Sequence, residues 1–434
     1  MRRLLFLIIP LLLITGKASA AEPTLTFRHR HFLYTVRPTA AWRTTRAVWT
    51  VNGKEISPPS SLLVDGDSIP PLPPGVVLTQ QDDWDRGAIR QALAMQVAEP
   101  LRRDPGSVVI RRTGTGSATG SGTIVFEGVG LPGREVDLDR AMDLTVAALE
   151  NGVREIMLPV KETQPQIRVE DPLLRQQGIT EVVTVGESDY SNSPANRRHN
   201  IAVGLSKFNG HLVPPGKTFS FGETLGRVDG TTGYLKELVI KGARTEPDYG
   251  GGLCQVSTTA YRGIWEYGFP IAKRINHSYT VSHYFPQGTD ATVYPPAVDM
   301  QFVNDSSGAL LIQTHREGNL AYFIYYGTRD ARRSTVLGPF IWDRKAPPPD
   351  RTEYTTELPP GERKKLGERV PGLKALWVRV VSRNGEVKQE PVYSFYEARP
   401  LYTLIGVEKL QFGTGTGTEI PTVFMEDTEV TSAE

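Results

Sequence analysis

The stretch YGGGLCQVSTT, residues 249–259, places three consecutive glycines just before Cys254, the only cysteine among 434 residues. Glycine lets the backbone turn sharply and approach a ligand closely. After the glycines, Val256, Ala260 and Ile264 repeat every four residues, and Gly268 and Pro270 follow, which predicts a helix over residues 254–268. We therefore expect a glycine loop that leads into a helix with a thiol in its first turn.

A thiol in this position can be reactive. The first turn of a helix presents unpaired N–H groups and a partial positive charge, which stabilise a thiolate and lower its pKa. The same N–H groups can hold the oxyanion of an acyl-transfer intermediate, at roughly 3 kcal/mol per donor. Two alternatives stay open: Cys254 is a small hydrophobic residue beneath a tight turn, or the loop binds phosphate. GGGLC lacks the Lys-Ser/Thr ending of a nucleotide loop, which speaks against phosphate.

A nucleophilic thiol needs a base, and the leading candidate among the seven histidines is His277, 23 residues after Cys254 and beyond the predicted helix. His283 is the reserve, because even spacing would put it on the same strand face. Asp290 is a candidate to orient the imidazole, although it can equally be a turn residue, and either histidine can be a packed or surface ring. A zinc site of Cys254, His277 and His283 is a further alternative. No close metal-ligand spacing is present, and we expect no metal and no cofactor.

The first residues, MRRLLFLIIPLLLITGKASAA, predict a secretory signal peptide over residues 1–20. The apolar run is short for a membrane span, although an uncleaved anchor is an alternative. No later stretch is apolar enough to span a membrane, so we expect an exported protein of the periplasm, the cell wall or the extracellular space, without a membrane span after signal cleavage. A formal net charge of +1 gives no reason to expect nucleic acid.

The rest of the chain predicts a multidomain α+β protein. We expect an α/β region at 21–187, a central mixed α+β domain of catalytic type at 188–335, a mostly β C-terminal domain at 345–412 and a flexible tail at 413–434. Asn384-Gly385 is typical of a hairpin turn. Helices are expected at 82–100, 137–152, 193–210 and 254–268. Strands are expected at 24–36, 107–114, 123–130, 155–169, 214–221, 233–243, 273–285, 287–304, 309–315 and 376–383.

Four segments together resemble the VanW-like domain family over about residues 188 to 315. They are NRRHNIAVGLSKFNGHLVPPGKTFSF, GYLKELVIKGA, GGGLCQVSTTAYRGIWEYGFPIAKRINHS and GTDATVYPPAVDMQFVN. Upstream, GREVDLDRAMDLTVAALENGVREIMLPVKETQPQI resembles the peptidoglycan-binding domain that often precedes it. Downstream, a pattern of spaced glycines is similar to the five-glycine envelope domain that often follows it: Gly361, Gly367, Gly372, Gly385 and Gly406.

The resemblance implies L,D-transpeptidase chemistry on peptidoglycan, with stem peptides and glycan as partners. It makes Cys254 the nucleophile and His277 the favoured base; at His283 the family more usually has a tyrosine, which leaves the choice of base open. It further implies a role in the site for four residues. Gly252, Gln255 and Ser257 would line it, and Arg274 would meet a stem carboxylate unless it is a surface charge. Two other functions are alternatives: a non-catalytic envelope-binding protein, and a thiol peptidase that acts on stem peptides.

Overall fold

The computed structural model describes residues 24–56, 74–114, 122–241 and 244–409. The predicted signal peptide and the predicted tail lie outside these residues. The chain divides into two compact units: the first comprises residues up to Arg102 together with Arg134–Lys161, and the second comprises Arg103–Gly133 and everything from Glu162 onward. The predicted boundary at residue 187 therefore does not separate the units, because residues 103–133 and 162–187 cluster with the later part of the chain.

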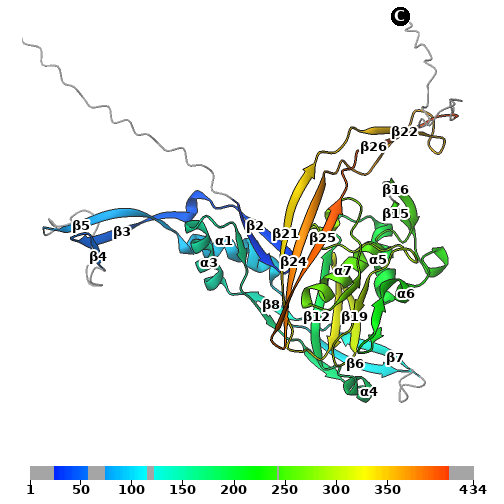
Figure 1. Ribbon diagram of the computed structural model, residues 1–434, viewed down its shortest axis with the longest axis horizontal. Helices are drawn as coiled ribbons and strands as arrows, with labels where there is room; N and C mark the ends of the chain where they lie inside the picture. Colours follow the sequence, from blue (N-terminus) through cyan, green and yellow to red (C-terminus); the bar gives the residue numbers. More distant parts are fainter. Residues whose placement is uncertain (1–23, 57–73, 115–121, 242–243, 410–434) are drawn as a thin grey trace, which may run out of the picture. The chain divides into compact units, whose positions relative to one another are not determined.

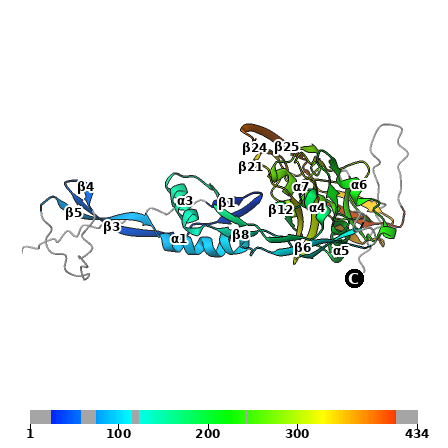
Figure 2. The ribbon, with the colours of Figure 1, turned by 90° about the horizontal axis from the view of Figure 1, so that it is seen from below.

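The first unit packs two helices against small sheets. Helices α1 and α3 lie side by side and share a core with β1 (Figure 2). Asp85 and Asp137 cap these helices by accepting the backbone N–H of Ala88 and Arg140. The helices of this unit are α1 (Arg86–Leu93), a π-helical turn (Ala94–Ala98), α2 (Glu99–Leu101) and α3 (Leu138–Glu150), with a 3-10 turn at Ala40–Trp42. Its strands form the sheets β2 (Phe32–Val36)–β1 (Leu25–His29)–β9 (Glu155–Met157) and β4 (Lys54–Ile56)–β3 (Arg43–Val51)–β5 (Val76–Trp84).

The helix predicted at 82–100 starts later than expected. Residues 76–84 form β5, which pairs with β3, and the helix begins only after the Asp85 cap. The helical run continues through the π-helical turn into α2 and ends at Leu101, next to the expected end at Pro100. β8 (Gly133–Val136) and β10 (Val160–Thr163) form a further two-stranded sheet.

The second unit holds the glycine–cysteine segment in helix α7 (Leu253–Tyr267), which confirms the helix predicted at 254–268. Figure 1 shows α7 beside strand β12 (Glu181–Asp189) of a four-stranded antiparallel sheet. The sheet order is β12–β20 (Leu320–Gly327)–β19 (Leu310–Glu317)–β13 (Leu212–Val213). The other helices of this unit are α4 (Pro172–Gln176), α5 (Ala195–Ser206) and α6 (Phe221–Leu225). Its small sheets are β11 (Gln166–Val169)–β6 (Ser107–Thr113)–β7 (Thr123–Gly128), β14 (Thr218–Ser220)–β18 (Gln301–Val303)–β17 (Ile271–Lys273) and β15 (Lys236–Lys241)–β16 (Arg244–Tyr249).

Helix α7 approaches the sheet closely because glycines face each other across the contact. A Cβ added to Gly186 of β12 would lie 1.9 Å from the carbonyl oxygen of Thr259, and one added to Gly263 of α7 would lie 2.4 Å from Gly186 N. Almost every side chain of α7 is buried, and Val256, Ile264 and Trp265 belong to the main core. The helix that carries Cys254 is therefore fixed along its length.

Two further expectations in this unit are wrong. Residues 273–285 and 287–304 do not form long strands: only Ile271–Lys273 and Gln301–Val303 are strand, and Ser282–Tyr284 is a 3-10 turn. The reason is that side chains take up the backbone groups here; for example, Asn276 Nδ2 donates to the carbonyl of His277 at 2.7 Å. Pro194 is the N-cap of α5, and the Ser193 hydroxyl before it accepts from the Arg197 guanidinium.

The C-terminal part is built of strands, as expected. Asn384 and Gly385, both with positive φ, form the turn between β24 and β25, as the sequence predicted. The first sheet is β21 (Arg333–Lys345)–β24 (Gly372–Arg383)–β25 (Glu386–Tyr396), and the second is β22 (Arg351–Thr355)–β26 (Tyr402–Gly406)–β23 (Arg363–Leu366). Because β21 begins at Arg333, the C-terminal sheet starts before the expected boundary at residue 345. The described residues thus form a mixed α and β protein with a β-rich C-terminal region.

Candidate active site

The glycine loop places the start of α7 beside α5. Gly252, the N-cap of α7, has a φ of 114°, which favours glycine, and a Cβ there would lie 3.0 Å from Arg197 Cγ. Asn200 of α5 holds the loop: its side chain donates to the carbonyl oxygens of Leu235 and Gly251 at 2.9 and 3.0 Å. The glycines therefore allow a tight turn that the Asn200 side chain of α5 holds in place.

Cys254 is half-buried in the first turn of α7. Its Sγ lies 3.5 Å from Thr292 Oγ1 and 3.6 Å from the carbonyl oxygen of Val293. No acceptor for the backbone N–H of Cys254 is found within the described part of the chain. This N–H is therefore available to hold an oxyanion that forms next to the sulfur.

His277 is held rigidly next to the thiol. Its Nδ1 lies 2.6 Å from Oδ2 of Asp290, and its backbone N–H donates to the same oxygen at 2.7 Å. The ring is 3% exposed and stacks on Tyr284, with 4.5 Å between ring centroids. Since Nδ1 faces the carboxylate, Nε2 is the nitrogen left for the thiol.

Asp290 in turn is fixed by groups from distant parts of the chain. Its Oδ1 accepts from Arg274 at 3.2 Å and from the hydroxyl of Tyr396, a residue of β25. Burial alone would raise the pKa of Asp290, but His277 and Arg274 outweigh it and hold the pKa well below the usual range of a carboxyl group. Asp290 therefore stays ionised and can stabilise a protonated His277.

The thiol and the imidazole shift each other's pKa in opposite directions. Burial raises the pKa of Cys254, but the charge of His277 and hydrogen bonds with His277 and Thr292 outweigh it, and the pKa falls to about 7. Burial lowers the pKa of His277, but the Cys254 thiolate and Asp290 outweigh it and raise the pKa to about 9. Near pH 8 the pair is thus a thiolate and an imidazolium, the reactive form of a cysteine–histidine pair.

The structure does not bring all the predicted site residues to the thiol. Gln255 is buried and bonds to Ser188 and Asp189, and Ser257 donates to the carbonyl of Ala291. Both side chains therefore bond α7 to neighbouring segments of the chain. Arg274 donates to Asp290 and, at 2.8 Å, to Ser394 Oγ. Its guanidinium therefore binds the Asp290 carboxylate.

His283 lines the cleft beside Cys254 but lies on the short 3-10 turn Ser282–Tyr284, not on a strand shared with His277. Burial and the nearby charge of Arg197 lower the pKa of His283 to about 4, so the ring is neutral at pH 7. His277, and not His283, is the ring coupled to the thiol and to Asp290.

The thiol opens into a cleft of about 520 Å³. Its walls come from the start of α7, the β15–β16 hairpin and the C-terminal segment around Gly367–Val370. Sequence reasoning missed four residues that shape the site: Arg197, Tyr284, Thr292 and Tyr396. None of these residues belongs to a local sequence pattern that is typical of a site. Each one comes close to the site only in the folded protein.

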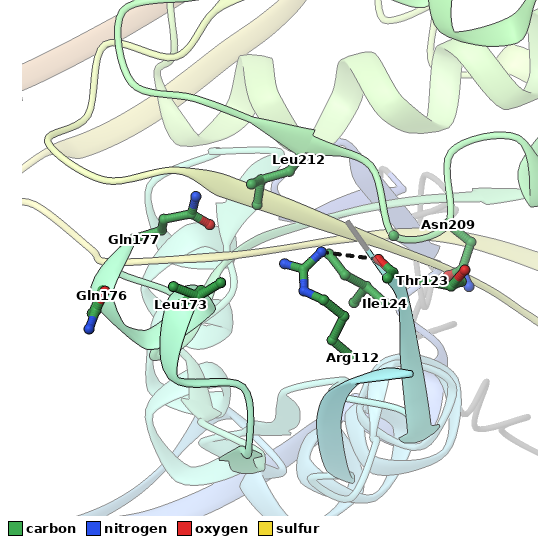
Figure 3. Close-up of a pocket in the computed structure, with 10 residues that line it drawn as sticks. Arg112, Thr123, Ile124, Leu173, Gln176, Gln177, Asn209 and Leu212 are labelled. Atoms are coloured by element: carbon green, nitrogen blue, oxygen red, sulfur yellow. Dashed lines mark hydrogen bonds between the residues drawn. The ribbon is translucent and has the colours of Figure 1, made fainter. Parts of the chain in front are cut away.

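A second cleft of about 660 Å³ lies between β6, β7, α4 and the turn before β13 (Figure 3). Arg112 projects into it, but its guanidinium is engaged with Asp171 at 2.7 Å and with the carbonyl of Gly122 at 3.1 Å. Among the described residues that line this cleft there is no cysteine, histidine or carboxylate. It therefore offers no nucleophile with a base.

No group of three or more histidine, cysteine, aspartate or glutamate side chains placed to hold a metal ion is found among the described residues. In the same part of the chain, no helix is both long and apolar enough to cross a bilayer.

The VanW-like protein family matches residues 196–325, a range that includes Cys254, His277 and Asp290. Residues 196–325 form a VanW-like domain. This confirms the resemblance seen over residues 188 to 315. The resemblances upstream and downstream stay predictions.

Two curated relatives match part of the chain. The uncharacterized protein YoaR of Bacillus subtilis is 33% identical over 140 residues, which cover 32% of this chain and 46% of YoaR. The vancomycin B-type resistance protein VanW of Enterococcus faecalis is 29% identical over 118 residues, which cover 26% of this chain and 42% of that protein. The chain thus spans less than half the length of each relative. No solved structure matches it significantly.

Proposed function

We propose that the protein is an exported cysteine L,D-transpeptidase that cross-links peptidoglycan stems through an acyl-enzyme on Cys254. The observation that carries the proposal is the order Cys254–His277–Asp290, in which Cys254 and His277 line a cleft, the thiol pKa is lowered and the imidazole pKa is raised. This order matches the roles of nucleophile, base and orienting carboxylate.

The chemistry follows from these positions. The Cys254 thiolate attacks the carbonyl carbon of the third stem residue, a diamino acid. The oxyanion that forms accepts a hydrogen bond from the backbone N–H of Cys254. The C–N bond breaks, the leaving amine of the terminal D-amino acid takes a proton from His277, and a thioester remains. A side-chain amine of a neighbouring stem then attacks the thioester; the C–S bond breaks and His277 takes the proton of the amine. Water in place of the amine would give hydrolysis through the same thioester.

The comparisons support a cell-envelope setting, because one relative bears the name of a vancomycin resistance protein. The peptidoglycan-binding region before the VanW-like domain and the five-glycine-like region after it would bind the polymer. Tyr396 of the C-terminal sheet bonds to Asp290, which gives that region a further role in the site itself.

Purified muropeptides incubated with the protein test the proposal by mass spectrometry. Cross-linked dimers are expected from the wild type and not from Cys254→Ala. Trimmed stems without dimers would instead identify a thiol peptidase. Unchanged muropeptides, or the same products from Cys254→Ala, would contradict catalysis at Cys254 and leave an envelope-binding role.

A further inference from the structure

Arg197 is a buried cation in the Cys254 cleft whose partners are all neutral. It lies on α5, lines the cleft and is 8% exposed. Its guanidinium donates to the hydroxyl of Ser193, to Gln255 Oε1 at 2.9 Å and to the hydroxyl of Tyr284 at 3.5 Å. The Tyr284 hydroxyl is uncharged, because burial raises its pKa above the usual tyrosine value.

Arg197 takes part in no ion pair among the described residues, since its hydrogen-bond partners are Ser193, Gln255 and Tyr284. Three carboxylates line the same cleft without pairing with it: Glu237, Asp248 and Glu368. A buried charge without a counterion is costly. A guanidinium has five N–H donors, and three hydrogen bonds leave two for a ligand. The free N–H groups, on Nε and Nη1, therefore fit an anionic group such as a carboxylate.

Arg197 is linked to His277 through Tyr284. Its Nη2 lies 3.5 Å from the hydroxyl of Tyr284, whose ring stacks on His277. Its Cγ lies beneath Gly252, where an added Cβ would come within 3.0 Å. Tyr284 thus links the guanidinium to the imidazole, and the stem of Arg197 contacts the first turn of α7.

Resting on the proposed function, we infer that Arg197 binds the α-carboxylate of the residue that leaves when Cys254 is acylated. His277 gives its proton to the leaving nitrogen, so the leaving residue lies on the His277 side of the scissile bond. Its carboxylate is separated from that nitrogen by one Cα, which puts it beside the guanidinium. Arg197 therefore selects donors that end with a free carboxylate one residue after the scissile bond.

Two synthetic donor tetrapeptides test this inference, one with a free C-terminal carboxylate and one with a C-terminal carboxamide. Release of the terminal residue is measured as kcat/KM for each. The wild type should prefer the free acid by about tenfold to a hundredfold, the range expected for hydrogen bonds to a charged group. Arg197→Gln should bring the ratio close to one by slowing the acid alone, and Arg197→Lys should keep part of the preference.

Arg198→Gln is the matched control. Arg198 is the next residue of α5, bonds to the carbonyl of Ser193 and to Asn319, and is not among the residues that line the cleft, so its replacement should keep the full preference. A wild type that treats acid and amide alike would overturn the inference and leave the proposed function standing, and so would an Arg197→Gln that slows both donors equally. No acyl-enzyme on Cys254 with either peptide would overturn the proposed function itself.

Discussion

Oδ2 of Asp290 receives both the ring Nδ1 and the backbone N–H of His277, at 2.6 and 2.7 Å. Two bonds from one residue to one oxygen fix the position of the ring as well as its tautomer. Because Nδ1 is committed to the carboxylate, Nε2 is the atom that can exchange a proton with Cys254. This relationship makes Asp290 a positioning residue for the base, and we expect its loss to slow the reaction.

Asp290→Asn should lower kcat/KM for stem-peptide turnover by about a hundredfold to ten-thousandfold, because an amide neither holds the productive tautomer nor stabilises the imidazolium. It also leaves Arg274 buried without its carboxylate, so thermal unfolding must be measured alongside. The control is Asp299→Asn. That carboxylate is also buried and bonds to Ser220 and Gly222, apart from the triad. Equal losses in the two variants would show that Asp290 acts on stability alone.

The reactivity of Cys254 should depend on pH in a defined way. The thiol pKa of about 7 means that the thiolate is present above this pH, and the His277 pKa of about 9 means that the imidazolium is present below that pH. Iodoacetamide alkylation should therefore rise through about pH 7, and kcat/KM should fall again above about pH 9. His277→Gln removes the charge that lowers the thiol pKa, so the alkylation midpoint should move upward.

His283→Gln separates the two candidate bases. His283 lines the same cleft, but Asp290 does not bond to its ring and it is not a cause of the lowered thiol pKa. The alkylation midpoint should therefore stay near pH 7 in this variant. A midpoint that moves in His283→Gln and stays in His277→Gln would assign the base to His283.

Tyr396→Phe should reduce kcat/KM by about tenfold, the effect of one hydrogen bond to a charged group. The Tyr396 hydroxyl donates to Asp290 and accepts a hydrogen bond from the N–H of Gly288 at 2.7 Å. Its removal would therefore take away the hydrogen bond by which the C-terminal sheet holds the Asp290 carboxylate. Tyr402→Phe is the control, since Tyr402 is equally buried in the neighbouring sheet and its hydroxyl makes no hydrogen bond among the described residues. Full activity in Tyr396→Phe would show that the C-terminal sheet does not support the site.

Gly186→Ala should lower the free energy of unfolding by about 3 kcal/mol, the upper part of the usual range for overpacking. The added Cβ would lie 1.9 Å from the carbonyl oxygen of Thr259, so α7 would have to move away from β12. Denaturant unfolding measures the change. Gly318→Ala is the control, because a Cβ there meets nothing within 4 Å and only its positive φ is costly. A Gly186→Ala protein as stable as the control would contradict the close packing of α7.

Local patterns in the sequence predicted the elements whose stability is local. The i, i+4 repeat of Val256, Ala260 and Ile264 predicted α7, and Asp137 predicted the start of α3, because helix periodicity and capping depend on nearby residues. The region around His277 was wrongly predicted as strand. Its composition is typical of strands, but its backbone groups bond to side chains such as Asp290.

Some residues of the candidate site could likewise be predicted from local sequence, and others could not. Cys254, His277 and Asp290 could be proposed from one segment of 37 residues, and the structure brings them together. Arg197 and Tyr396 could not, since they lie 57 residues before Cys254 and 106 residues after Asp290 and reach the site only through tertiary packing. The resemblance also placed Gln255 and Ser257 in the site, but in the structure their buried side chains bond to Ser188, Asp189 and Ala291.

Intact-protein mass spectrometry during turnover of a synthetic tetrapeptide donor tests the central claim most directly. The account predicts a covalent adduct with the mass of the acyl part of the donor after loss of its terminal residue, located by peptide mapping on the peptide that contains Cys254. Cys254→Ala should give neither adduct nor product. Product formation by Cys254→Ala, or an adduct on another residue, would contradict the account.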